Sequence, residues 1–429
     1  MKKTTSTFNV IDFNLFKQQM LSWMNRFNIC CLLDNHQYNS KYNSIECIAA
    51  AGCANYFIAA DNVQQQLKTF LQKNNDWLFG HVSYDFKNKI EPLHSNHFDG
   101  VQFPDVFLFQ PEALIRLSEK EVEISSVSIS PKKIFDEIVQ EKITSQSASS
   151  NIDPHARISK EKYLQTIQQL KQHIFRGDCY EINFCQEFFA EETIIDPLNV
   201  YLQLTKISPV PFSCFYKLND KYLLCASPER YIKKTKNNII SQPIKGTFKR
   251  DLSNNLQDEL LKKQLSESAK EKSENVMVVD MVRNDLSKIC KEATVVVEEL
   301  FGVYSFPQVH QMISTVSGEL QDDIDFADVL HATFPMASMT GAPKRKVMEL
   351  IEQYEQTKRG IYSGCVGYIS PEKDFDFNVV IRSIAYNESN KYLSYQVGGG
   401  ITFNSDAEKE YEECLLKAEA IKKVLQNKM

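Results

Sequence analysis

The sequence has no apolar run of 18 residues, no C-x-x-C pair and no excess of basic residues. The first absence argues against a membrane-spanning helix, and no apolar segment follows the two N-terminal lysines, as an export signal would require. A formal net charge of -6 argues against a nucleic-acid partner. The eleven cysteines lack zinc-ligand spacing and are odd in number. We therefore expect a cytoplasmic protein with reduced thiols and neither nucleic-acid nor membrane partners.

The chain has 429 residues with 43% hydrophobic composition, enough for two or three domain-sized units. The amino-acid composition changes at 118–157. This stretch is polar, lacks clear periodicity and ends in TSQSASSNIDPHARIS. Such a stretch predicts a surface linker. We therefore expect an N-terminal lobe at 1–117, a polar linker region at 118–157 and a larger C-terminal region at 158–429.

Regular elements follow this polar stretch. Tyr163, Ile167, Leu170 and Ile174 recur at spacings of 4, 3 and 4, which predicts an amphipathic helix ending at Gly177. Beyond it, apolar runs such as FSCFYKL and KYLLCAS come in adjacent pairs joined by short polar turns. This arrangement favours antiparallel strand pairing over parallel strands with crossover helices.

Two predicted helices each carry a pair of glutamates near an apolar stripe. In the segment 266–284, Glu271 and Glu274 are three residues apart on the face of the stripe. Glu410 and Glu413 repeat this spacing in the segment that starts at 405. Together the pairs would make an all-oxygen site of the kind that Mg²⁺ prefers, with the cation relieving their repulsion. Alternatively, the glutamates lie at the polar edges of their helices and are simply solvated.

The motif QPIKGT at 242–247 places Lys245 between an isoleucine and a glycine, at an expected strand end. In such apolar surroundings the amine would lose contact with water, which would lower the pKa of Lys245 toward that of a usable nucleophile. Alternatively, the ammonium group extends into solvent from an ordinary strand end.

Other residues are candidates for anion binding or proton transfer. Gly398 and Gly400, in VGGGI, could let backbone N–H groups approach a carboxylate, or mark a bulge or tight strand crossing. Arg382 could bind a carboxylate with both ends of its guanidinium, or form an ion pair on a sheet face. His310 and Glu229 flank a strand or turn and could transfer protons, although a single residue of either type is more often structural.

Taken together, the motifs resemble those of the chorismate-utilising enzymes, the family of anthranilate synthase and aminodeoxychorismate synthase. They occur in the family's order over roughly 157–425 as ASPERY, QPIKGT, ENVMVVDMVRNDL, VHQMIS, FPMASMTGAPK, VGYIS, VVIRS, GGGIT and EKEYEE. The lysine of PIKGT is similar to that of the aminodeoxychorismate synthase branch, since anthranilate synthases carry alanine there. The resemblance implies an α+β fold, a large sandwich of two antiparallel sheets covered by helices, with 158–429 as the chorismate-binding catalytic region.

The resemblance also implies a reaction. Lys245 would attack C2 of chorismate while the C4 hydroxyl leaves, and ammonia would then enter at C4 and expel the lysine. The product would be 4-amino-4-deoxychorismate, a precursor of para-aminobenzoate and folate. Glu229 matches the general acid and base, and His310 the histidine beside the substrate ring.

Further roles follow from matched positions. The residues that match substrate-binding or pocket-lining positions are Thr340, Tyr362, Arg382, Gly398 and Gly400. Glu274 and Glu413 match ligands of Mg²⁺, with Glu271 and Glu410 as companions that act through bound water.

Such synthases receive ammonia from a separate glutamine amidotransferase, and this chain carries neither its cysteine elbow nor a lyase domain, so a partner subunit is expected.

One departure from the family is Glu181, which stands where relatives commonly have glutamine. The isochorismate branch has a lysine base in the strand matching YEINF, and this chain has none. Two alternatives are an anthranilate synthase component I, which would release pyruvate, and a catalytically silent chorismate-binding subunit.

Overall fold

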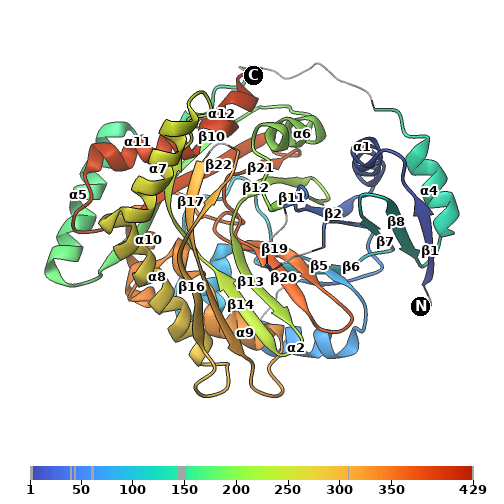
Figure 1. The fold of residues 1–429 in the computed structure, drawn as a ribbon, viewed down its shortest axis with the longest axis horizontal. Helices are drawn as coiled ribbons and strands as arrows, with labels where there is room; N and C mark the ends of the chain where they lie inside the picture. The colour runs from blue at the N-terminus through green and yellow to red at the C-terminus, as the bar shows by residue number, and fades with distance from the viewer. Residues whose placement is uncertain are drawn as a thin grey trace.

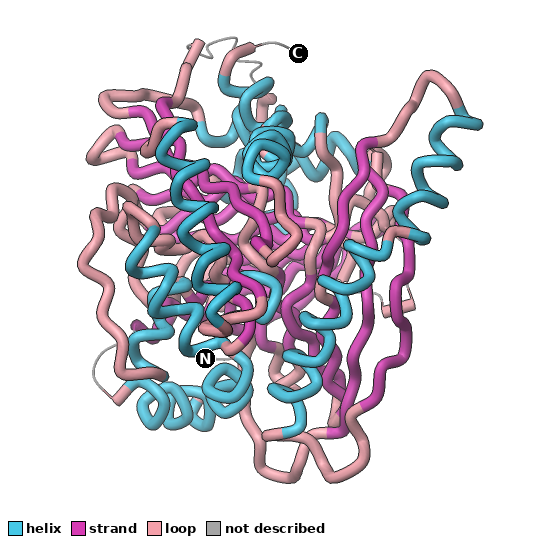
Figure 2. Tube along the Cα trace, turned by 90° about the vertical axis from the view of Figure 1, so that its left-hand side faces the viewer, coloured by secondary structure: helices cyan, strands magenta, loops and turns pink. Residues whose placement is uncertain are grey.

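Two antiparallel β-sheets pack face to face at the centre of the molecule, and helices cover their outer faces (Figure 1). The structure is a computed structural model that describes residues 3–38, 41–42, 45–58, 62–143, 151–307 and 309–427. Figure 2 shows the strands running through the middle of the molecule with helices outside them. This confirms the predicted α+β sandwich.

The first sheet has twelve strands in the described residues. Their order is β1 (Thr4–Asn9), β8 (Glu121–Ser126), β7 (Ala113–Leu117), β3 (Cys47–Ala51), β2 (Ile29–Asp34), β11 (Phe212–Leu218), β12 (Lys221–Ser227), β21 (Ser383–Asn387), β22 (Tyr392–Ile401), β10 (Glu181–Ala190) and β18 (Gly341–Ala342), with β9 (His155–Ala156) beside β10. The longest pairing joins β10 to β22 from Ile182–Ile401 to Ala190–Leu393.

The second sheet has ten strands in the same part of the chain. Their order is β15 (Ile244–Lys249), β17 (Val309–Glu319), β14 (Asn238–Gln242), β13 (Arg230–Thr235), β20 (Phe375–Asn378), β19 (Cys365–Ile369), β5 (Leu78–Val82), β6 (Val106–Gln110) and β4 (Asn55–Ile58), with β16 (Val296–Ser305) beside β17. The two halves of the chain are interleaved, because β2 lies between β3 and β11 and β5 lies between β6 and β19.

The helices divide between the two outer faces. The first sheet is covered by α1 (Phe13–Met24), α4 (Pro131–Val139), α5 (Lys160–Arg176), α6 (Pro197–Ile207), α10 (Lys344–Tyr354), α11 (Ala407–Lys417) and α12 (Glu419–Leu425). The second is covered by α2 (Val63–Lys73), α7 (Asn255–Glu267), α8 (Ala269–Ser287) and α9 (Phe326–Thr333), while the short α3 (Lys87–Ile90), η1 (Tyr84–Phe86) and η2 (Ala337–Met339) lie in connections. Among the described residues, no helix is long and apolar enough to cross a membrane.

Aromatic and aliphatic side chains of both sheets form the layer between them, including Phe79, Phe109, Tyr216, Leu223 and Val366. Because strand side chains alternate between faces, the opposite faces are free to bury the apolar stripes of the helices. The apolar stripes of the helices therefore pack on these outer faces.

Several predicted elements are confirmed. The helix α5 ends at Gly177, whose φ of 83° lies in the left-handed region that caps helices. The helix α8 begins after Ser268, whose side chain accepts a hydrogen bond from the backbone N–H of Glu271. The C-terminal helix begins after Asp406, as the sequence allowed, but is interrupted at Ala418.

The prediction of an irregular linker at 118–157 is wrong for its first half. That half contains β8, which pairs with β1 and β7 and buries Val122 and Ile124, and α4, which buries Ile134 and Ile138. These elements are polar on their outer faces, so their composition resembles a linker although their apolar residues are periodic. Residues 144–150 lie outside the described part of the chain. That the segments 1–117 and 158–429 form separate lobes stays a prediction.

Candidate active site

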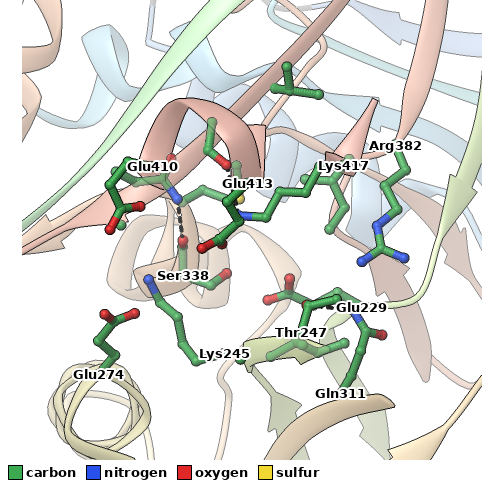
Figure 3. Close-up of a pocket in the computed structure, with 18 of the residues that line it drawn as sticks. Glu229, Lys245, Thr247, Glu274, Gln311, Ser338, Arg382, Glu410, Glu413 and Lys417 are labelled. Atoms are coloured by element: carbon green, nitrogen blue, oxygen red, sulfur yellow. Dashed lines mark hydrogen bonds and ion pairs between the residues drawn. The ribbon is translucent and has the colours of Figure 1, made fainter. Parts of the chain in front are cut away.

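A polar cavity lies where the ends of both sheets meet two helices (Figure 3). It encloses about 820 Å³, open solvent included. Its walls come from β10 and β22 of the first sheet, β15 and β17 of the second, α8, α11 and the loops around 338 and 382. The sequence-predicted residues that line it are Glu229, Lys245, Glu271, Glu274, Tyr362, Arg382, Gly398, Gly400, Glu410 and Glu413.

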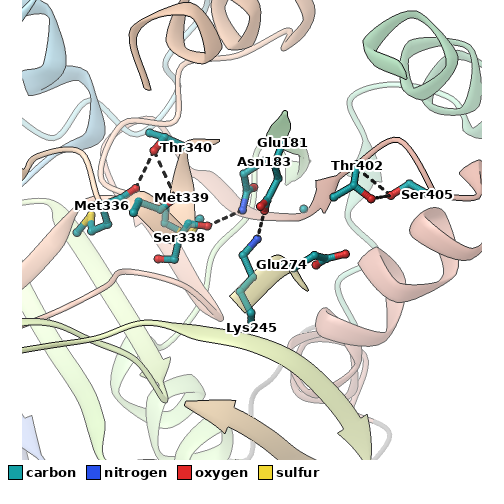
Figure 4. Close-up of polar contacts among 12 residues, drawn as sticks. Glu181, Asn183, Lys245, Glu274, Met336, Ser338, Met339, Thr340, Thr402 and Ser405 are labelled. Carbon is teal, nitrogen blue, oxygen red and sulfur yellow. Dashed lines mark hydrogen bonds and ion pairs between the residues drawn. The ribbon is translucent and has the colours of Figure 1, made fainter. Parts of the chain in front are cut away.

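Lys245 points from β15 into the middle of this cavity (Figure 3). The side chain is 9% exposed, and its Nζ donates a hydrogen bond to Oε1 of Glu181 on β10 (Figure 4). A Cβ atom at Gly400 would lie 2.5 Å from that Oε1 and 2.7 Å from Nζ. Because glycine has no side chain, residue 400 does not collide with the ion pair between Glu181 and Lys245.

The charge state of Lys245 differs from the prediction. Burial alone would lower the pKa of its amine, as we expected, but the carboxylates of Glu181, Glu274 and Glu229 outweigh burial and raise that pKa. The resting side chain is therefore an ammonium ion paired with Glu181. The neighbours of Lys245 in the chain are apolar, whereas the carboxylates around it come from distant parts of the sequence that the fold brings together.

Glu229 lies between β12 and β13, on the opposite side of the cavity from α8 (Figure 3). Burial raises the pKa of its carboxyl to about 7, although hydrogen bonds from Ser338 and from the backbone N–H of Ile244 and the charges of Lys245 and Arg382 act in the other direction. A carboxyl group with a pKa near neutrality is half protonated at pH 7 and can both give and take a proton. This position suits a general acid.

The four glutamates face each other across the cavity. Glu271 and Glu274 come from α8, and Glu410 and Glu413 come from α11. Two lysines lie among them in this structure. Nζ of Lys270 lies 3.8 Å from Oε1 of Glu274 and 3.4 Å from Oε1 of Glu410, and Nζ of Lys417 lies 2.9 Å from Oε1 of Glu413.

The carboxylate oxygens of these four glutamates are ligands of the type that a divalent cation prefers. Oε1 of Glu274 is buried without a hydrogen-bond partner, and burial raises the pKa of this carboxyl to about 7. Glu410 is also buried, so two carboxylates face each other away from water. A cation with oxygen preference would stabilise them. In the described part of the chain, however, no three His, Cys, Asp or Glu side chains converge closely enough to hold a metal.

Arg382 and Tyr362 present polar groups to the same cavity. Arg382 has a φ of 50°, and its guanidinium makes no hydrogen bond or ion pair with the described residues. Burial lowers the pKa of Arg382 to about 10, with Glu229 acting in the other direction. Tyr362 is buried, and its hydroxyl contacts Sγ of Cys185 at 3.8 Å. An unpaired cation in a strained backbone conformation is typical of a ligand-binding position.

The structure places two predicted residues away from the cavity wall. His310 is on β17, and successive side chains of a strand point to opposite faces. Its ring nitrogens lie 3.0 Å from Oδ1 of Asp258 and 2.9 Å from Oγ of Ser305, while the next residue, Gln311, lines the cavity. The expectation that His310 lies beside the substrate ring is therefore corrected. Thr340 uses its hydroxyl to donate to the carbonyl oxygen of Met336, 3.0 Å away (Figure 4).

Sequence reasoning missed several residues of the wall. They are Asn183, Thr247, Lys270, Gln311, Ser338 and Lys417. Lys270 and Lys417 had a signal, because each lies four residues from a predicted metal-ligand glutamate and can pair with it along the helix. Asn183 donates to the backbone carbonyl of Ser338 at 2.9 Å, and this tertiary contact leaves no mark in the sequence (Figure 4).

Several known proteins are similar to this chain in sequence. The chain is 31% identical over 362 residues to the aminodeoxychorismate synthase component 1 of Bacillus subtilis, covering 81% of this chain and 76% of that protein. It is 40% identical over 271 residues to a probable chloroplastic aminodeoxychorismate synthase of rice, covering 62% of this chain. The chain spans only 30% of the length of the rice protein and 32% of the length of its Arabidopsis counterpart.

Solved structures share the fold at lower identity. Anthranilate synthase component I of Streptococcus pneumoniae superposes with a TM-score of 0.77 at 24% identity, covering 90% of this chain and 94% of that one. The menaquinone-specific isochorismate synthase of Escherichia coli gives a TM-score of 0.77 at 18% identity, covering 99% and 95%. Residues 29–423 match the family described as chorismate binding enzyme. The chain therefore belongs to the chorismate binding enzyme family.

Proposed function

We propose that this protein converts chorismate and ammonia to 4-amino-4-deoxychorismate through a covalent adduct on Lys245. The observation that carries the proposal is the position of Lys245, which projects into the cavity between Glu229 and Glu274. Relatives named aminodeoxychorismate synthase component 1 support the same reaction, including those of Bacillus subtilis and Klebsiella aerogenes at 31% and 33% identity.

The first half of the reaction needs a neutral amine. Lys245 therefore has to lose its proton before Nζ forms a bond to C2 of chorismate, while both ring double bonds shift and the C–O bond at C4 breaks. Glu229, in its protonated form, gives its proton to the departing hydroxyl, which leaves as water. With a pKa near 7, Glu229 carries this proton in a useful fraction of molecules at neutral pH.

In the second half, ammonia forms a bond to C4, both double bonds return to their original positions and the bond between C2 and Nζ breaks. Lys245 is released as an amine, and the product keeps its enolpyruvyl group. Two easier substitutions thus replace one difficult substitution. Arg382 is suited to hold a substrate carboxylate, because its guanidinium has no partner among the described residues.

Glu274 and Glu413 would hold Mg²⁺, with Glu271 and Glu410 beside them. When bound, this ion supplies a Lewis acid and a template for the ring carboxylate. The residues themselves position the substrate, since the two helices that carry the glutamates form opposite walls of the cavity.

We also propose a glutamine amidotransferase subunit as the source of ammonia. We further propose a cytoplasmic location, which the eleven free cysteines support.

The test is mass-resolved chromatography of chorismate incubated with the purified protein, Mg²⁺ and ammonium. We expect aminodeoxychorismate from the natural protein, and at least a hundredfold less from Lys245→Ala, since it lacks the nucleophile. Lys263→Ala, on the exposed face of α7, is the matched control. Without ammonia, the intact mass of the natural protein should increase by that of chorismate less water.

Other products would identify the alternatives. Anthranilate with pyruvate would assign the protein to the anthranilate synthase reaction and remove the role of Lys245. Absence of turnover, even with an amidotransferase supplied, would favour a silent chorismate-binding subunit.

A further inference from the structure

A second cavity opens beside the active-site cavity and shares part of its wall. It encloses about 960 Å³, open solvent included. Thr247, Arg382, Glu413 and Lys417 line both cavities, so the two spaces meet at these side chains. We call the second space the outer chamber.

The charged residues of the outer chamber are mainly basic. Its basic lining residues are Lys249, Arg250, Arg382, Lys417 and Lys423. Glu413 and Glu419 are the acidic residues of the lining, and Asp258 lies behind Arg250 at 2.6 Å. Five cations therefore face three carboxylates, and two positive charges are left without compensation.

The uncompensated charges are distributed along the chamber. Glu419 is shared by two lysines, with Nζ of Lys423 at 2.7 Å and Nζ of Lys249 at 3.7 Å. Both lysines are well exposed, at 64% and 47% of their side-chain surface for Lys249 and Lys423. Further in, Arg382 lies at the boundary with the active-site cavity and has no ion-pair partner among the described residues. Excess positive charge is thus present both at the exposed lysines and at the boundary with the catalytic cavity.

We infer that the outer chamber is an anion-binding antechamber that captures a small dicarboxylate substrate through Lys249 and Lys423 and passes it to Arg382. This inference rests on the proposed function, which makes the substrate a dianion. One uncompensated positive charge lies at the lysine pair and the other at Arg382, and a charged concave surface raises the local concentration of an oppositely charged ligand. The same field repels ammonium, so this chamber selects one of the two substrates.

The test compares Lys249→Glu/Lys423→Glu with the natural protein at several NaCl concentrations. We expect KM for chorismate to increase about tenfold at low salt while kcat changes less than about twofold, because the lysines lie outside the catalytic cavity. In 0.5 M NaCl the KM difference should fall below about threefold, since exposed charges are screened. The neutral variant Lys249→Gln/Lys423→Gln should show the same pattern with a smaller increase, and circular dichroism checks that each variant folds.

The matched control is Lys132→Glu/Lys133→Glu on α4, which makes the same charge change on exposed residues at the opposite end of the first sheet. An unchanged KM, or a fall in kcat alone, would overturn the inference. So would loss of glutamine-dependent activity with ammonium-dependent activity intact, which would make this face a docking site for the amidotransferase.

Calorimetric titration with chorismate, without ammonia, separates this inference from the proposed function. Weaker binding by the double variant supports the antechamber even if the natural protein makes no aminodeoxychorismate. Equal binding at low salt rejects the antechamber even if the natural protein is an active synthase.

Discussion

Replacement of Glu181 by glutamine should make Lys245 reactive at lower pH. In the natural protein, the Glu181 carboxylate accepts a hydrogen bond from Nζ and helps to raise the pKa of Lys245. Removal of an adjacent opposite charge typically changes a pKa by about 1–3 units. Since the nucleophile is the neutral amine, each unit by which its pKa falls increases the reactive fraction about tenfold below that pKa. Glu274 and Glu229 still favour the ammonium form, so we expect the pKa of Lys245 to fall by about one unit.

The assay is the rate at which the intact mass of the protein increases with chorismate, measured from pH 6 to 10 without ammonia. Leaving ammonia out removes the effect of its own protonation. Glu229 must be protonated for the same step, so above about pH 7 its loss of the proton offsets the increase in neutral Lys245, and the absolute rate levels off. The ratio of Glu181→Gln to natural protein cancels this effect, and we expect a ratio of about ten or more at pH 7.

Glu181→Asp keeps the negative charge and is the matched control, for which we expect a pH profile close to that of the natural protein. A rate for Glu181→Gln below the natural rate at every pH would refute the reasoning. It would mean that Glu181 has to accept the proton of Lys245 and does more than stabilise the ammonium form.

Two further predictions concern the same cavity. Gly400→Ala should reduce kcat about a hundredfold, because its Cβ would lie 2.7 Å from Nζ of Lys245 and move the nucleophile out of position; steady-state kinetics test this, and kcat at the natural level would contradict it. Lys270→Gln should bind Mg²⁺ several-fold more tightly in calorimetry without chorismate, because it removes the ammonium that lies near Glu274 and Glu410. Weaker Mg²⁺ binding by this variant would show that Lys270 does not compete with the cation.

Periodic patterns predicted much of the fold and part of the site. The end of α5 at Gly177 and the placement of two glutamates each on α8 and α11 follow from spacing within one helix. Such features depend on neighbours three or four residues away, which the sequence displays directly.

Features that depend on distant residues were missed or wrong. The charge of Lys245 is set by Glu181, which belongs to the other sheet, and the direction of His310 depends on which face of β17 meets the cavity. The strand β8 was hidden because its outward residues are charged, although Val122 and Ile124 alternate with them. Composition averages over both faces of an element and therefore conceals this alternation.

The interleaving of the two halves of the chain has a consequence for synthesis. The strands β2 and β5 leave the ribosome long before β11 and β19, with which each has to pair. Until then, one edge of each stays open to pairing with other chains. Completion of both sheets has to await the C-terminal part of the chain, and such long-range pairing slows folding. A nascent chain interrupted before β19 should therefore aggregate where a protein with consecutive domains would already have folded its first one.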